Sequence, residues 1–170
     1  MELNEYIAMQ LDSAKRMMNR VIDTLQPAEL AWRPACGCNS IGLILFHVIR
    51  SEDSFIQARL QGKTEIWESG KWFEKMKLPV SEAGAHYNVD QVNSFRVPEL
   101  KDMLAYFDAV RKSTLDYVKG LKPADFEKKI TMPRFGDMTI AAVLNIVVSH
   151  TSQHIGELSY IRGIERGMDK

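Results

Sequence analysis

Cysteine is scarce in this sequence. The two residues present, Cys36 and Cys38, are separated by a single position. This spacing is not that of a Cys-x-x-Cys motif, and no other cysteine exists to complete a zinc ribbon. We therefore expect a reduced pair of thiols in a loop.

An excess of charge of either sign is also absent. Lys and Arg number 22, as do Asp and Glu, and no basic block stands out, so no nucleic-acid partner is predicted. No apolar run approaches the ~20 residues that span a bilayer. The N-terminal segment has early acidic residues and no long apolar stretch, which is unlike a signal peptide. We expect a cytoplasmic protein with no membrane partner.

The composition that remains is that of a soluble globular protein, with 45% hydrophobic and 26% charged residues. A length of 170 residues fits one domain with a hydrophobic core, so we predict a single domain over residues 1–170. Apolar residues at helical spacing predict long helices, with no strand-rich region. These helices are expected over residues 4–25, 39–61, 98–120 and 139–166, with a short helix within 66–76. The predicted fold class is all-α, as a four-helix bundle.

A faint internal repeat relates the two halves of the chain. The segment Leu25–Leu30 resembles Leu121–Phe126, and each follows one predicted helix and precedes a loop into another. Ser40 and Thr139 then stand at matching helix-cap positions. Two such halves, packed pseudo-symmetrically, would bring the helices that follow these caps face to face.

Histidine is scarce too, and three of the four histidines lie in predicted helices with an apolar face. His150 and His154 are four residues apart, so their rings share one face of a helix. In the register of the repeat, His47 occupies a stripe equivalent to that of His150. The fourth histidine, His86, lies in the long connection, where we expect it to be solvated or to pack the loop.

Two interpretations of the helical histidines are open. As core residues they would bond to Ser, Thr or backbone groups. As metal ligands they would each use one ring nitrogen, while a neighbouring acceptor takes the other. Imidazoles are costly to bury without partners, and three of them leave positions open, as in catalytic metal sites. The pattern favours one divalent metal at His47, His150 and His154.

Two segments resemble the DinB superfamily of metal-dependent enzymes. Leu25–Ile56 looks like that family's entry into the second helix, with an Asn-Ser-Ile-Gly start and a histidine seven residues after Ser40. His150–Gly163 resembles its His-x-x-x-His-x-Gly-Gln signature, with Glu157 where Gln is usual. The resemblance covers both ends of the chain, and the middle fits by helix pattern.

The resemblance implies an up-down-down-up four-helix bundle with a long crossover between helices two and three. It also implies that His47, His150 and His154 bind one divalent metal ion, zinc or nickel, and that the chain forms a homodimer. Relatives include mycothiol-dependent maleylpyruvate isomerase, bacillithiol transferases and proposed hydrolases. We therefore expect a metal-dependent transferase or hydrolase for a small-molecule substrate, with a low-molecular-weight thiol as a partner in S-transfer.

Further residues have predicted positions around this site. Glu157 is the candidate catalytic residue, as a proton shuttle; orienting a ligand histidine and pairing with a surface charge are the alternatives. Trp32 and Arg33 are candidate substrate-binding residues at the mouth, where Arg33 would hold an anionic group; loop packing and a surface ion pair are the alternatives. Glu52 and Asp53 lie about 140° and 240° around the helix from its histidine, so we expect them to face water or other elements.

The alternative function is a non-catalytic metal-binding bundle with a structural or partner-binding role. Structural zinc sites are usually closed by four protein ligands. A fourth ligand from Cys36, Cys38, Glu157 or His86 would favour this alternative. The scattered glycines form neither a phosphate loop nor a dinucleotide fingerprint, so no other cofactor is predicted.

Overall fold

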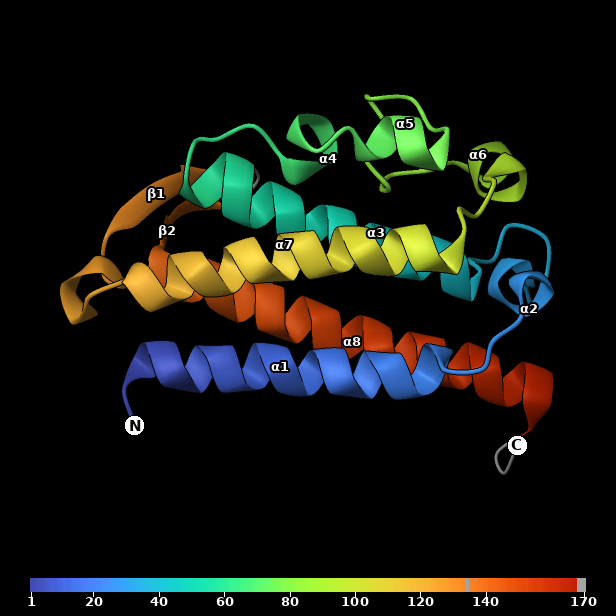
Figure 1. Ribbon diagram of the computed structural model, residues 1–170, viewed down its shortest axis with the longest axis horizontal. Helices are drawn as coiled ribbons and strands as arrows, with labels where there is room; N and C mark the ends of the chain where they lie inside the picture. The colour runs from blue at the N-terminus through green and yellow to red at the C-terminus, as the bar shows by residue number, and fades with distance from the viewer. Residues whose placement is uncertain (134, 168–170) are drawn as a thin grey trace.

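Four long helices form the body of the computed structural model, which describes residues 1–133 and 135–167. They are α1 (Leu3–Ile22), α3 (Ile41–Asp53), α7 (Leu100–Gly120) and α8 (Ile140–Arg166). In Figure 1, α1 and α8 run from left to right, whereas α3 and α7 run from right to left. α1 and α3 each pack against both α7 and α8. Within the described residues, no helix is long and apolar enough to cross a membrane.

Helix starts follow the local sequence closely. The Ser40 side chain accepts a hydrogen bond from the backbone N–H of Leu43 at 3.2 Å, which caps α3. The Thr139 side chain accepts one from Ala142 at 3.1 Å, which caps α8 in the same way. The repeated Pro-Ala segments also form similar elements, the short helix α2 (Pro27–Ala31) and the 3₁₀ turn η2 (Pro123–Asp125). The internal repeat therefore appears at the level of local structure.

The helix predicted over residues 39–61 is not a single α-helix. α3 ends at Asp53, and the chain continues as a π-helix, η1 (Ser54–Leu60). Gly62, with φ of 62°, follows its end. The prediction of one α-helix was wrong here because an apolar pattern does not distinguish an α-turn from the slightly wider π-turn.

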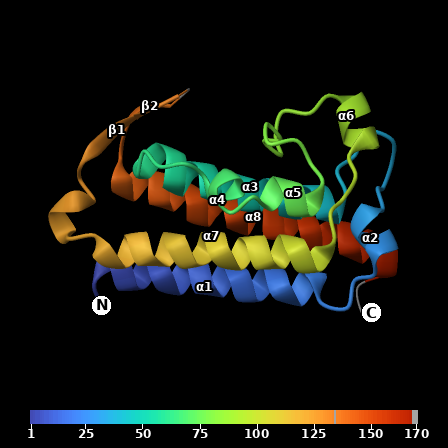
Figure 2. The same ribbon diagram turned by 45° about the horizontal axis from the view of Figure 1, so that its top comes forward.

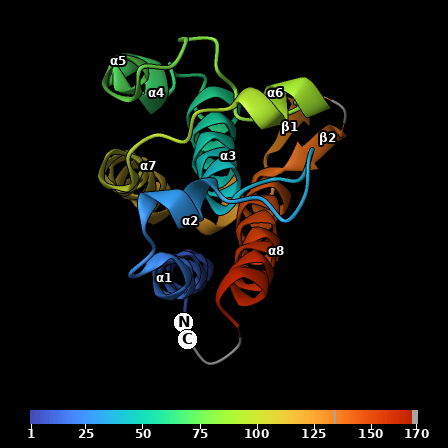
Figure 3. The ribbon, with the colours of Figure 1, turned by 90° about the vertical axis from the view of Figure 1, so that its right-hand side faces the viewer.

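The connection between η1 and α7 carries three short helices. The short helix predicted within residues 66–76 is divided into α4 (Ile66–Ser69) and α5 (Trp72–Met76), because Lys71 between them adopts a left-handed conformation. α6 (Val89–Ser94) follows. Seen end on in Figure 3, α6 lies on the side of α3 and α8 that faces away from α1.

The prediction of an all-α fold was wrong in one respect. β1 (Lys129–Met132) pairs antiparallel with β2 (Gly136–Thr139), with Lys129 opposite Thr139. The two four-residue strands are too short to produce a clear alternation of apolar and polar residues. The hairpin directly precedes α8 and projects over the end of α3 in Figure 2.

Two acids of α3 tie it to neighbouring elements. Glu52 is buried and accepts from Arg111 of α7 at 2.7 and 2.9 Å. Asp53 is buried and accepts from the backbone N–H groups of Ile66 and Trp67 at 2.9 and 2.8 Å. Both acids therefore face other elements, which was one of the two predicted environments, and neither faces water.

Candidate metal centre

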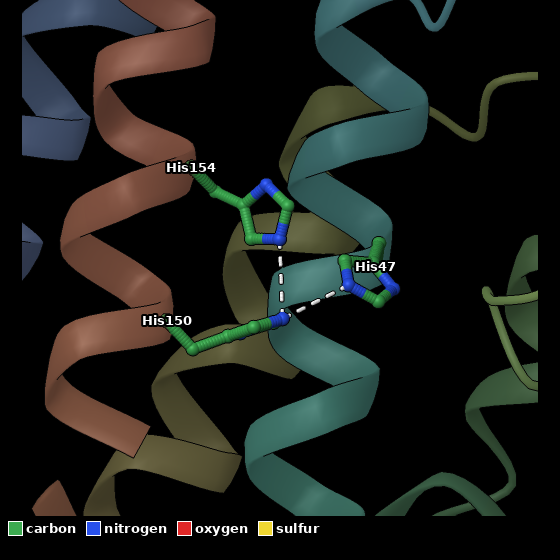
Figure 4. A group of neighbouring side chains, drawn as sticks. All are labelled: His47, His150 and His154. Atoms are coloured by element: carbon green, nitrogen blue, oxygen red, sulfur yellow. Dashed lines mark hydrogen bonds between the residues drawn. The ribbon is translucent and has the colours of Figure 1, made fainter. Parts of the chain in front are cut away.

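Three histidine side chains meet between α3 and α8 (Figure 4). Nε2 of His150 lies 3.1 Å from Nε2 of His47 and 3.1 Å from Nε2 of His154. The three candidate donor atoms all lie within 4.8 Å of one another, and all three residues are half-buried. The packing of α3 against α8 thus joins a residue of the N-terminal half to two residues of the C-terminal half.

The outer ring nitrogens hold two of the rings in place. His47 Nδ1 donates to the backbone carbonyl of Gly84 at 2.8 Å, and His154 Nδ1 donates to Oε2 of Glu157 at 2.7 Å. A ring that carries its proton on Nδ1 presents a lone pair at Nε2. Both rings therefore direct an electron pair towards the centre of the cluster.

The three rings alone cannot provide a hydrogen-bond partner for every Nε2 atom of the cluster. His150 Nε2 has at most one proton to donate, yet it lies 3.1 Å from the Nε2 atoms of both other rings. At most one of these two contacts can therefore be a hydrogen bond, and at least one lone pair at the centre is left without a partner. A cation at the centre would bind all three lone pairs, so the donor set fits a metal ion.

The donor spacing is also compatible with a metal. Zinc binds imidazole nitrogen at about 2.0–2.1 Å, which places two nitrogens of a tetrahedral site about 3.3 Å apart. The observed separation of 3.1 Å is close to this value. Among the described residues, no fourth His, Cys, Asp or Glu joins the cluster.

The protonation of the rings favours ligation as well. Burial, together with the neighbouring His154 and His47, lowers the pKa of His150 to about 4. Burial also lowers the pKa of His47, against the opposing effect of its bond to Gly84. Near neutral pH these two imidazoles are therefore neutral, which is the form that binds metals.

Gly84 and Glu82 position His47, and neither residue was predicted from the sequence. Gly84 has φ of 71°, and a Cβ atom there would lie 3.1 Å from the ring of Phe46. Its backbone can therefore approach α3 only without a side chain. Glu82 Oε1 accepts from the Gly84 N–H at 3.0 Å and from the Tyr87 hydroxyl. A glycine in a long irregular segment is the only sequence signal that this loop offers.

The other predicted site residues differ in whether they contact the histidine cluster. Glu157 contacts the cluster through His154 and remains 42% exposed. Trp32 is half-buried against the apolar core. Arg33 Nη2 donates to the backbone carbonyl of Val92 at 2.7 Å, so it holds α6 in place. Neither Trp32 nor Arg33 is among the described residues that line the hollow beside His47.

The predicted alternative ligands lie outside the cluster. Cys36 and Cys38 are free thiols, and Asn93 donates to the Cys36 sulfur at 3.2 Å. His86 is exposed in the loop beside the cluster, with φ of 62°. It is among the residues that line a pocket of about 240 Å³ together with His47 and His154. A small molecule in this pocket would reach His47 and His154.

A larger pocket lies elsewhere. It has a volume of about 680 Å³ and lies between α5, α6 and the start of α7. Among the described residues that line it, none is one of the three histidines. Because the candidate metal ligands converge at the smaller pocket, we take it as the candidate functional site despite its smaller volume.

A sequence profile of the DinB superfamily matches residues 10–158. Among solved structures, the chain is similar to a conserved protein from Enterococcus faecalis, with a TM-score of 0.87 over 99% of both chains. The two sequences are 22% identical, so this likeness concerns the fold alone. The search of curated proteins finds no match.

Proposed function

The chain belongs to the DinB superfamily, and from this premise we propose that it is a divalent-metal-dependent enzyme that acts on a small molecule. His47, His150 and His154 hold the metal ion through their Nε2 atoms. Zinc and nickel both suit imidazole ligands. The observation that carries the proposal is the convergence of one donor atom from each histidine within 4.8 Å, beside a pocket.

An enzyme is favoured over a structural site because the cluster contains three protein donors, whereas structural zinc sites usually have four. A divalent cation at this place supplies Lewis acidity, which lowers the pKa of a water molecule or a thiol that reaches it. Gly84 and Glu157 orient the ligand rings. Glu157 is partly exposed, so it can also pass a proton between solvent and the pocket.

The reaction we propose is S-transfer with a low-molecular-weight thiol or, with water in its place, hydrolysis. The two differ in whether sulfur reaches the metal. Adding a low-molecular-weight thiol to cobalt-substituted protein should change the visible spectrum in the first case. An unchanged spectrum would favour hydrolysis.

The metal proposal is tested by elemental analysis of purified protein. We expect close to one divalent metal ion per chain in the wild type and in His86→Ala, which removes an imidazole outside the cluster. His150→Ala should lose most of the metal. Metal at 100 times its dissociation constant should stabilise the wild type by about 2.7 kcal/mol. Metal-free wild type of full stability, unaffected by a chelator, would contradict the proposal.

A coordination count from the metal's X-ray absorption edge tests the catalytic role separately. Three protein nitrogens with exchangeable ligands are expected. Four protein ligands would instead favour a non-catalytic metal-binding bundle with a structural or partner-binding role.

We also propose that the chain is one up-down-down-up four-helix-bundle domain that pairs as a homodimer. The opposed directions of the long helices support the bundle. The exposed apolar side chains of α1 and α8 support pairing, among them Tyr6, Met9 and Tyr160. Sedimentation velocity at micromolar concentration should give the mass of two chains.

A further inference from the structure

A second hollow adjoins the pocket at the histidines. It has a volume of about 370 Å³ and lies between the end of α3, η1 and the β-hairpin. We name it the hairpin groove; its lining includes Arg50, Ser54, Phe55, Arg59, Glu65, Met132 and Phe135. Ala85 and His86 line both hollows, so the groove continues from the metal site towards the hairpin seen above α3 in Figure 2.

The π-helix turns Arg59 towards this groove. On a continuous α-helix, Arg59 would lie about 120° around the axis from His47. The wider π-turn sets each side chain back by about 15°, which amounts to about 75° over the steps from Ser54 to Arg59. Arg59 therefore lies on nearly the same side of the helix as His47, in agreement with its place in the groove lining.

Among the described residues that line the groove, Arg59 is an arginine whose charge has no partner in the protein. Its side chain is exposed and forms no ion pair or hydrogen bond with any described residue. Arg50, which also lines the groove, is instead engaged by Glu65 at 2.8 Å and by the Tyr106 hydroxyl at 3.0 Å. Glu65 is thereby held by Arg50, so it leaves the charge of Arg59 to a ligand.

Three other lining residues are suited to an apolar body. Phe55 and Met132 face the groove from η1 and β1, and Phe135 is 58% exposed at the hairpin. An aromatic ring this exposed beside a hollow provides apolar surface whose burial by a ligand is favourable. The groove therefore combines apolar side chains with the guanidinium of Arg59, which lies 12 positions beyond His47 in the chain.

We propose that the hairpin groove binds the substrate and that this substrate is an organic acid. Its carboxylate pairs with Arg59, its apolar body packs on Phe55 and Phe135, and its other end reaches the three histidines. The helical rise from His47 to Ser54 is about 10 Å. Because side chains of a helix lean towards its N-terminus, we expect an acid about 10 Å long to span the groove between the histidines and the Arg59 guanidinium. As an assignment of the substrate, this inference rests on the proposed function.

Two probes that differ only in charge test the assignment. The acid 4-phenylbutanoate and the neutral 4-phenylbutanamide are titrated calorimetrically into the metal-containing protein. The acid should bind roughly five- to tenfold more weakly to Arg59→Gln than to the wild type. The amide should bind equally to both proteins. Arg16→Gln removes an exposed arginine of α1 and should change neither affinity.

A further variant tests the apolar part of the groove. Phe135→Ala should weaken the binding of both probes, because both carry the phenyl group. Equal binding of the acid to wild type and Arg59→Gln would overturn the proposal, as would the absence of acid binding to the wild type.

The metal and the groove have separate readouts. Arg59→Gln should keep the wild-type metal content, which is measured by elemental analysis. His150→Ala should lose metal but retain binding of 4-phenylbutanoate that depends on Arg59. Absence of metal from the wild type would refute only the proposal of a metal-dependent enzyme. Equal binding of the acid to wild type and Arg59→Gln would refute only the proposal for the groove.

Discussion

The ligand rings of the cluster are oriented by two different kinds of acceptor. His47 donates to a backbone carbonyl, that of Gly84, whereas His154 donates to the side chain of Glu157. A backbone acceptor survives substitution at its own position more readily than a side chain does. Glu157 is therefore the residue at which the effect of an outer hydrogen bond on the site can be measured directly.

Replacement of Glu157 should affect metal affinity in proportion to the hydrogen bond that is lost. In Glu157→Ala, His154 Nδ1 loses its acceptor, and we expect metal affinity to fall about 10- to 100-fold. In Glu157→Gln, the amide oxygen still accepts, so the loss should be much smaller. Competition titration against a chromophoric chelator measures both, and equal affinity in wild type and Glu157→Ala would contradict the orienting role.

At the scale of elements, the site depends on how α3 is held between α7 and α8. The buried pair of Glu52 and Arg111 joins α3 to α7, and Thr114 donates to the same carboxylate at 2.8 Å. Arg111 also donates to the backbone carbonyl of Leu11, so it extends the contact to α1. One guanidinium therefore links three of the four long helices.

Arg111→Met should destabilise the protein by about 3–5 kcal/mol, because it leaves the Glu52 carboxylate buried without its charge partner. Urea denaturation followed by circular dichroism measures the loss. The double variant Glu52→Leu/Arg111→Met removes both charges and should recover most of the stability. A single variant with an unchanged urea midpoint would show that the pair does not hold α3 to α7.

At the scale of the whole molecule, burial of the histidines couples stability to pH. The pKa of His150 is about 4 in the folded chain and near 6.5 when unfolded, because burial disfavours its charged form. Between these values the unfolded chain binds more protons than the folded one. The stabilisation is therefore complete above pH 6.5 and is lost as the pH falls towards 4.

For chelator-treated protein, we expect the free energy of unfolding to decrease steadily from pH 7 to pH 4.5. His150→Asn lacks the titrating ring and should show a shallower decrease over the same range. Urea titrations at several pH values measure both slopes. Identical slopes for the two proteins would contradict the lowered pKa of His150.

Much of the fold follows from local patterns. The caps at Ser40 and Thr139 place the starts of α3 and α8 correctly, because a side-chain acceptor at a helix start acts within three residues. The hairpin and the π-helix were missed, since their strands and turns are too short to change the periodicity of the chain. Arg59 illustrates the consequence, because an α-helical projection places it away from His47.

The sequence by itself determined that His150 and His154 share one helix face, because their spacing of one turn is a property of any α-helix. Only the tertiary structure decided that His47 meets them, 103 residues away from His150 along the chain. It also decided that the carbonyl of Gly84 holds His47 and that Arg111 neutralises Glu52. These contacts join segments that are distant in the chain, and a local pattern specifies which face of a helix is buried without specifying which residue will pack against it.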